Sequence, residues 1–243
     1  MSILLLFNFP AQSTELIETL KKIKPSVVAI GIANPTASPR IRLIGSGFVV
    51  SPGNRVVTNY HVIANPLDES KLEQYVVLSG QGTVFKVHPI QQQKHAPAVD
   101  LALLTIAGQL PALNVSQAPL IEEGSAIAFT GFPITQVLGL YPATHSGIIA
   151  AQTPIAIPAV NARNLQAAML RQLDEPYLVY QLDAVAYPGN SGSPLYRPDS
   201  GEVIGIINQV YIKSSREAVL SDPSGISYAI PSRHLLELMQ QPD

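Results

Sequence analysis

Short segments rich in β-branched residues, separated by turns rich in glycine and proline, run through most of this 243-residue chain. Many short strands joined by such turns are typical of barrels and sandwiches, and they argue against alternating βα units. Turns are expected at 51–54, 79–82, 188–190, 198–201 and 222–225. Strands are expected at 27–32, 41–50, 56–63, 75–87, 99–106, 126–131, 147–151, 177–182, 203–212 and 226–230.

Helical spacing of apolar residues interrupts the β pattern near both ends of the chain. A helix is predicted over 15–22 with Ser13 as its cap, and a second over 233–240 with Ser232 as its cap. A shorter helix is expected over 164–173, inside a long loop. The buried face of the last helix is expected to consist of Leu235, Leu236 and Met239.

The composition excludes several classes of protein. Apolar residues make up 47% of the chain and charged residues 13%, which suits a packed core and not a disordered chain. The net charge is −2 and no basic run is longer than Lys21-Lys22, so a nucleic-acid footprint is absent. Without cysteine there is no disulfide framework and no thiol nucleophile. No apolar stretch is long enough for a membrane span.

The first residues leave the cellular compartment open. An apolar run at 3–9 is followed by small residues at 11–13, as at a signal-peptide cleavage site, but no Lys or Arg precedes it. A signal remnant, an ordinary apolar segment and a truncated start are the alternatives. We expect a periplasmic or secreted protein, with a cytoplasmic location as the alternative.

The hexapeptide from Gly189 to Pro194 has the features of a nucleophile loop. Hydrolysis of an amide needs an activated nucleophile, a base and donors for the developing oxyanion. Gly189 and Gly192 flank Ser191, allow a tight turn, and leave the amides of Gly189 and Ser191 free to point one way. The alternative is a plain hairpin turn, because Gly, Asn and Ser are also the commonest turn residues.

His61 and Asp100 are polar residues in apolar surroundings. His61 would end the strand at 56–63, where the alternative is a core histidine with satisfied hydrogen bonds. Asp100 would interrupt the strand at 99–106, where a carboxylate needs a partner such as a histidinium, and the alternative is an edge residue facing water. Asp68 lies in a polar run and is expected to be solvated. The other histidines are expected to be exposed: His88, His95, His145 and His234.

Taken together, these segments resemble a bacterial trypsin-like serine peptidase of the chymotrypsin clan, nearest to its HtrA-type and glutamyl-endopeptidase branches. The resemblance runs from about residue 25 to residue 231. The segments around the histidine, the aspartate and the serine follow the order of the clan, His then Asp then Ser. The matching segments are 45–52, 58–63, 99–104, 130–133, 183–194, 201–206 and 225–231.

The resemblance implies an all-β fold of two six-stranded antiparallel Greek-key barrels, chymotrypsin-like, with short N- and C-terminal helices. It implies a serine endopeptidase that acts on polypeptides, in which His61 is the general base, Asp100 orients it and Ser191 is the nucleophile. The expected domains are an N-terminal segment at 1–25, a peptidase domain at 26–230 with barrels at 26–118 and 119–230, and a C-terminal helix and tail at 231–243.

The chain departs from the family pattern in several places. Asn190 stands where trypsin has an aspartate that pairs with a new N-terminus, so activation by N-terminal cleavage is not implied. Ser193 replaces the second glycine of the common Gly-Asn-Ser-Gly-Gly pattern, as in the glutamyl endopeptidases. The loop at 152–175 is longer than usual, and the PDZ domain that commonly follows in HtrA-type proteins is missing.

Alignment on the serine loop places Val185 and Ala186 at the base of the primary specificity pocket, with Val185 where trypsin carries an aspartate. Ile207 falls where glutamyl endopeptidases carry a histidine, and the substrate backbone would add as a strand beside Asn208 and Gln209. An apolar floor predicts small or medium apolar residues before the scissile bond and rejection of charged ones. The alternative is that these apolar side chains are plain core residues and that the long loop sets selectivity.

Other functions fit the sequence less well. An α/β-hydrolase esterase needs Gly-x-Ser-x-Gly and the order Ser, acid, His, whereas position 193 is Ser and the order here is reversed. A metallopeptidase needs a cluster such as His-Glu-x-x-His, which the chain lacks, so neither a metal nor another cofactor is expected. The main alternative is a catalytically inactive trypsin-like binding module, since fold does not dictate function. Such copies usually lose a triad residue, and this chain keeps all three.

Overall fold

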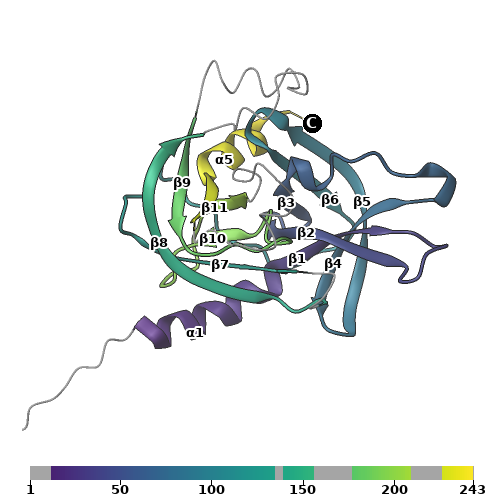
Figure 1. Cartoon of the computed structure of the whole chain (residues 1–243), viewed down its shortest axis with the longest axis horizontal. Helices are drawn as coiled ribbons and strands as arrows, with labels where there is room; N and C mark the ends of the chain where they lie inside the picture. Colours follow the sequence, from purple (N-terminus) through teal and green to yellow (C-terminus); the bar gives the residue numbers. More distant parts are fainter. Residues whose placement is uncertain (1–11, 135–138, 156–176, 209–225, 243) are drawn as a thin grey trace, which may run out of the picture.

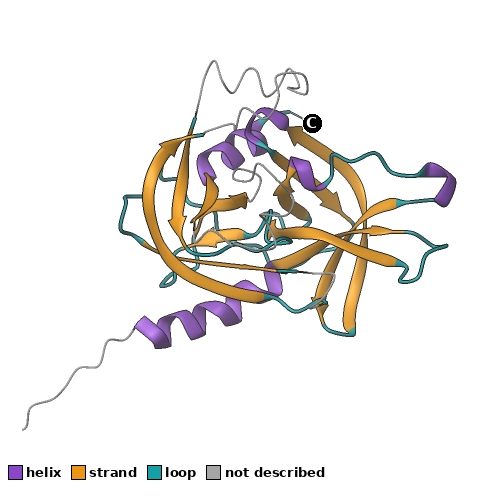
Figure 2. Ribbon diagram, in the orientation of Figure 1, coloured by secondary structure: helices purple, strands orange, loops and turns teal. Residues whose placement is uncertain are grey.

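Two closed barrels of six antiparallel strands form the body of the protein (Figures 1 and 2). The computed structural model describes residues 12–134, 139–155, 177–208 and 226–242. The expected all-β, chymotrypsin-like fold is therefore confirmed. The short helix predicted at 164–173 and the end of the strand predicted at 203–212 lie outside the described residues.

The first barrel is closed in the order β1-β2-β3-β6-β5-β4. The strand predicted at 41–50 has those bounds, whereas the strand predicted at 75–87 is a hairpin, because the chain reverses at Gly82 and Thr83. Its strands are β1 Val27–Ala33, β2 Ile41–Val50, β3 Arg55–Asn59, β4 Gln74–Gln81, β5 Val84–Ala96 and β6 Leu101–Ile106.

The second barrel is closed in the order β10-β11-β12-β9-β8-β7. Strand β10 was not predicted, because it has only three residues and no alternating pattern of its own, yet it pairs with both β7 and β11. The strands are β7 Ala126–Gly131, β8 Ala143–Pro154, β9 Leu178–Asp183, β10 Pro194–Tyr196, β11 Val203–Asn208 and β12 Ile226–Pro231.

The terminal helices lie outside the barrels, as expected, but both predicted caps are wrong. Helix α1 spans Gln12–Ile23, so Ser13 lies inside it. Helix α5 spans Ser232–Gln240, and the Ser232 hydroxyl donates to the Ser116 carbonyl at 3.1 Å instead of capping the helix. Helix α5 contacts β5 and β6 of the first barrel as well as β11 and β12 of the second, so it joins the two.

The buried face of α5 is also rotated from the predicted one. His234, Leu235 and Leu238 are buried, whereas Leu236 and Met239 are only half-buried. Residues three and four positions apart share one face of a helix, so burial of Leu238 brings both Leu235 and His234 into the interface with it. The imidazole contacts Tyr177 edge-on, with ring centroids 4.8 Å apart.

The histidines differ from expectation in their exposure. His95 is exposed, as predicted, but His88 and His234 are buried and His145 is half-buried. Burial lowers the pKa of His88, His145 and His234, because removal from water disfavours the charged imidazolium. The His88 side chain is 3% exposed, and its Nε2 lies 2.8 Å from the Ser79 hydroxyl, a partner that the sequence around His88 does not indicate.

We predict that the protein loses stability as the pH falls from 7 to 5. Below about pH 6.5 the unfolded chain takes up protons that buried histidines of the folded protein do not bind, so the free energy of unfolding decreases. The His88→Gln variant should lose less stability than the wild type over this range. The difference should be about 1.4 kcal/mol for each unit by which burial lowers the pKa of His88.

Thermal melting across this pH range checks the prediction. The matched control is His95→Gln, which changes an exposed histidine on the same strand and should leave the pH dependence of the wild type unaltered. If His88→Gln and His95→Gln had the same pH dependence, the buried histidine would not be its source.

Candidate active site

His61 and Asp100 were predicted to lie within the strands at 56–63 and 99–106. Both lie instead in turns that flank paired strands. His61 is in the 3₁₀ turn Tyr60–Val62 that follows β3, and Asp100, with φ 53°, ends the 3₁₀ turn that precedes β6. Strands β3 and β6 are antiparallel with Asn59 opposite Leu101, so the end of one strand meets the start of the other. This register places the histidine next to the aspartate.

The Asp100 carboxylate accepts three hydrogen bonds. One oxygen accepts from the His61 backbone N–H at 2.8 Å, and the other lies 2.7 Å from His61 Nδ1 and 2.9 Å from Asn208 Nδ2. Asp100 is 8% exposed, so the alternative of a residue facing water is wrong. An ionised carboxylate can only accept, so Nδ1 carries the proton and Nε2 is left as the acceptor nitrogen.

The backbone of Asp100 is fixed as well as its side chain. Its carbonyl accepts from the Tyr60 N–H and from Asn59 Nδ2, both at 3.1 Å. The Asp68 side chain, by contrast, is 38% exposed, in keeping with its polar run, and it pairs with Lys71 at 2.7 Å. The hydrogen bond from Lys71 lowers the pKa of Asp68 to about 2.

Ser191 is 6% exposed and lies between Gly189 and Gly192, whose φ angles of 100° and 88° are in the left-handed region that favours glycine. Ser46 of β2 holds this loop at two points. Its backbone N–H donates to the Ser191 carbonyl at 2.9 Å, and its hydroxyl donates to the Gly189 carbonyl at 2.6 Å. The loop of the second barrel is thereby tied to a strand of the first.

The Ser46 hydroxyl also accepts from the N–H of Phe132 at 2.9 Å, so one side chain links β2, the serine loop and the end of β7. Space for it depends on Gly131, where a Cβ atom would collide with the hydroxyl of Ser193 and lie 2.8 Å from that of Ser46. Ser46 and Gly131 lie in the matching segments 45–52 and 130–133, but no role was predicted for Ser46.

Two short paths connect the serine loop with the His61–Asp100 pair. A Cβ atom at Gly45 would lie 2.7 Å from the Val62 side chain and 3.4 Å from the Ser191 carbonyl, so both segments pack against one point of β2. The N–H of Gly192 donates to the Ile207 carbonyl at 3.0 Å, and the next residue, Asn208, binds Asp100. Asn208 was predicted only to lie beside the substrate.

The residues assigned to the specificity pocket come from β11 and from the loop after β9. Ile207 is fully buried in the core of the second barrel, and Val185 and Ala186 are half-buried on the loop after β9. The Ala186 N–H donates to the Ser227 hydroxyl at 2.7 Å, a contact that no sequence pattern indicated. Gln209 lies outside the described residues.

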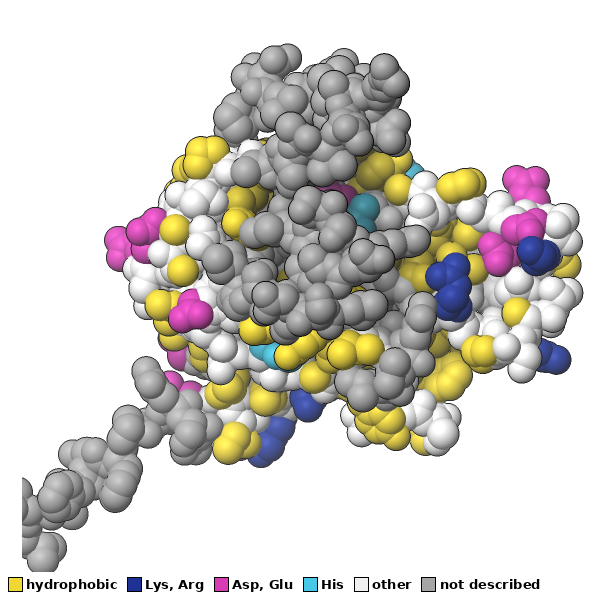
Figure 3. All heavy atoms as spheres, in the orientation of Figure 1, with side chains coloured by type: hydrophobic (Ala, Val, Ile, Leu, Met, Phe, Trp, Pro, Cys, Tyr) yellow, Lys and Arg dark blue, Asp and Glu magenta, His cyan; other side chains and the backbone are white. Residues whose placement is uncertain are grey.

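The described residues contain no group of three or more His, Cys, Asp and Glu side chains that could hold a metal ion. Within the same part of the chain, no helix has the length and apolar character needed to cross a membrane. Basic and acidic side chains are interspersed over the visible described surface (Figure 3).

Comparison with known proteins identifies the family of the chain. Residues 45–206 match the model of the trypsin-like peptidase domain. A probable periplasmic serine endoprotease, DegP-like, from Halomonas elongata is 28% identical over 201 residues, which are 82% of this chain and 35% of that protein. Serine protease HTRA1A from Danio rerio is 29% identical over 229 residues, 92% of this chain and 40% of that protein. The chain thus spans well under half the length of these curated relatives.

Solved structures agree with the fold. The HtrA-type protease AlgW with a tripeptide superposes with a TM-score of 0.65 at 26% identity, over 93% of this chain and 62% of that one. A protease from M. tuberculosis in its active form superposes with a TM-score of 0.67 at 20% identity, over 100% and 97% of the two chains, and this likeness concerns the fold alone. Because the family model covers more than half of the chain, the protein belongs to the trypsin-like peptidase family, with HtrA and DegP proteases as its relatives.

Proposed function

We propose that the protein is a serine endopeptidase in which Ser191 is the nucleophile, His61 the general base and Asp100 the residue that orients it. The observation that carries the proposal is the Asp100 carboxylate, which binds both the backbone and Nδ1 of His61 while Asn208 holds its second oxygen. A buried carboxylate that fixes an imidazole, together with a glycine-flanked serine, supplies the groups that activate a hydroxyl for acyl transfer.

The proposed reaction begins with a proton transfer. His61 Nε2 takes the proton of the Ser191 hydroxyl as its oxygen attacks the peptide carbonyl, and the resulting imidazolium is stabilised by Asp100. The same proton passes to the leaving amine when the C–N bond breaks, which leaves an acyl-enzyme. Water, deprotonated by His61, then hydrolyses the ester and regenerates Ser191.

The amides of Gly189 and Ser191 are assigned to the oxyanion. The Pro188 carbonyl accepts from the Ile134 N–H at 2.5 Å, and the Asn190 carbonyl accepts from the Ser193 N–H at 3.0 Å. In a trans peptide the N–H points opposite to the C=O, so each amide is directed away from the partner of its carbonyl. These directions support the assignment of the Gly189 and Ser191 N–H groups as donors that are oriented before the substrate binds. Donors fixed in advance are what stabilises a developing oxyanion.

Reaction with a fluorophosphonate, combined with peptidase assays, tests the triad. Ser191→Ala should abolish labelling and lower turnover by about 10⁶-fold, His61→Ala should lower turnover by a similar factor, and the double variant by little more, because the residues act as a unit. Ser193→Ala, two residues along the same loop, is the matched control and should still react.

The outcomes separate the two candidate functions. Additive losses in the double variant would contradict the assigned roles, provided that circular dichroism shows each variant to be folded. A wild-type protein that is folded but never labelled would instead be the inactive binding module.

We propose that the specificity pocket accepts small or medium apolar residues before the cleaved bond. Val185, Ala186 and Ile207 present only aliphatic groups, and Ala186 and Ile207 belong to one apolar cluster. Burial of a substrate charge without a partner is costly, so Lys, Arg, Asp and Glu should be rejected. Discrimination among aliphatic residues should be modest, about 1–3 kcal/mol per methylene.

Cleavage of a mixed peptide library checks this preference. Val185→Asp should shift it toward Lys and Arg, because the new carboxylate would provide a partner for their charge. The control, Val84→Asp, makes the same substitution at a residue that is 80% exposed and should leave the preference unchanged. A dominant charged residue before the cut in the wild type would show that the pocket is assigned wrongly.

We also propose that the protein acts outside the cytoplasm, on polypeptide substrates. The support is the match to relatives described as probable periplasmic endoproteases, together with the apolar run at 3–9. Fractionation of the native protein between periplasm and cytoplasm tests this location, and recovery in the cytoplasm alone would exclude it.

A further inference from the structure

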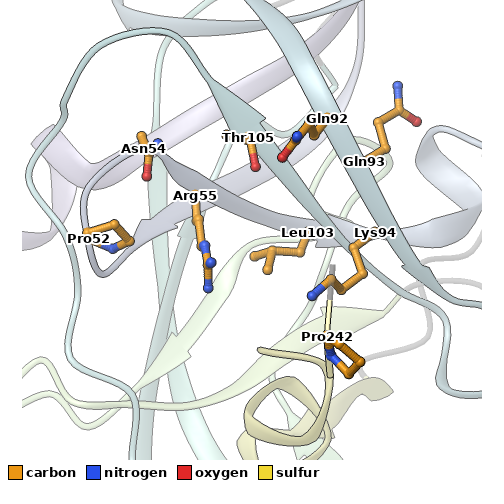
Figure 4. Close-up of a pocket in the computed structure, with 9 residues that line it drawn as sticks. All are labelled: Pro52, Asn54, Arg55, Gln92, Gln93, Lys94, Leu103, Thr105 and Pro242. Atoms are coloured by element: carbon orange, nitrogen blue, oxygen red, sulfur yellow. The ribbon is translucent and has the colours of Figure 1, made fainter. Parts of the chain in front are cut away.

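A pocket of about 550 Å³ opens on the first barrel, and Pro242 near the end of the chain is among its lining residues (Figure 4). We refer to it as the barrel-one pocket. Its volume falls within the range of small-molecule sites, about 300–1,000 Å³. None of its lining residues belongs to the proposed active site.

The sheet register explains why two cations lie on the same face of this pocket. Arg55 of β3 and Gln92 of β5 both pair with Thr105 of β6, and Lys94 of β5 pairs with Leu103. Residues 103 and 105 of one strand point to the same side. Arg55 and Lys94 therefore stand on that side too, diagonally across β6, and Figure 4 shows their charged ends flanking Leu103.

The two cationic side chains that line the barrel-one pocket differ in their contacts. Its lining includes Arg55 and Lys94 but no Asp or Glu. The Lys94 ammonium donates to the Gln241 carbonyl at 2.6 Å, and Arg55 has no ion-pair partner among the residues that the structure describes. A guanidinium without a carboxylate, in a concave site, favours the binding of an anion.

Neutral groups in the lining fit an organic anion better than a bare ion. Gln92 and Thr105 offer donors beside Arg55, while Leu103 and Pro242 offer apolar surface. Asn54 lines the same pocket, and its side-chain oxygen is buried without a hydrogen-bond partner. A small rotation of that amide would let it accept from an N–H or O–H group of a ligand.

We propose that the barrel-one pocket binds a small organic anion, with a carboxylate or phosphate group held by Arg55 and Lys94. The planar guanidinium can bind either group through two parallel hydrogen bonds. Arg55 lies four residues before Asn59 along β3, which separates it from the His61 turn by about 13 Å at roughly 3.3 Å per residue. This site is separate from the proposed active site and does not depend on peptidase activity.

Isothermal titration at constant ionic strength tests the proposal with three probes: citrate, inorganic phosphate and N-acetyl-Glu-Glu. We expect saturable binding of at least one probe at one site per chain. Citrate would indicate a free polycarboxylate, the dipeptide an acidic peptide, and phosphate a phosphate ester. Propane-1,2,3-tricarboxamide, a neutral analogue, should not bind.

Substitutions locate the site. Arg55→Gln should weaken binding by at least tenfold, and Arg55→Gln combined with Lys94→Gln should abolish it. The matched control removes the same two charges elsewhere on the first barrel, with Arg42→Gln on β2 and Lys86→Gln on β5, both exposed. Thermal melting confirms that each variant is folded, and the single variant keeps the Lys94 contact with Gln241.

Two results would overturn the proposal. One is the absence of saturable binding for all three probes. The other is an equal loss of affinity in the control variant, which would mean that the net charge of the barrel, rather than the barrel-one pocket, attracts the anion.

Discussion

The buried carboxylate of Asp100 is the constraint on which the active-site arrangement depends. A carboxylate that is 8% exposed is stable as an anion only if hydrogen bonds replace its water. The first barrel supplies two of these bonds through His61, and the second supplies one through Asn208. Moving the barrels apart would therefore leave the aspartate short of a donor, so the orientation of the imidazole is coupled to the contact between the two barrels.

Around Ser191 the same contact is maintained by small residues at close range. Ser46 reaches across from β2, and Gly131 leaves the space that Ser46 and Ser193 occupy. Behind them the Asn190 side chain is fully buried, and neither of its polar atoms has a hydrogen-bond partner. A buried amide without a protein partner next to the proposed nucleophile is consistent with a functional position.

The sequence predicted the fold well because barrel strands and turns are local patterns. Strands β2 and β7 were predicted with their observed bounds, whereas β10 was too short to show a period. Prediction was poorer wherever long-range contacts decide the outcome. Ser232 bonds to a residue 116 positions away instead of capping its helix, and His88 of β5 is buried with the Ser79 hydroxyl of β4 beside its imidazole. The roles of Ser46 and Asn208 likewise come from pairing between distant segments, which a motif can place in a loop but cannot connect.

Strand β6 shows how one alternation of side chains serves both parts of the first barrel. Ala102 and Leu104 point into the barrel core, while Leu101 and Leu103 belong to the cluster that includes Leu235 and Leu238 of α5. A strand covered on both faces appears in sequence as a continuous apolar run, which is why residues 101–104 lack polar alternation. Thr105 is the next residue on the outer side, and there the cover of α5 gives way to the barrel-one pocket. The change from Leu103 to Thr105 along one face therefore marks the point where the contact with α5 ends and the barrel-one pocket opens.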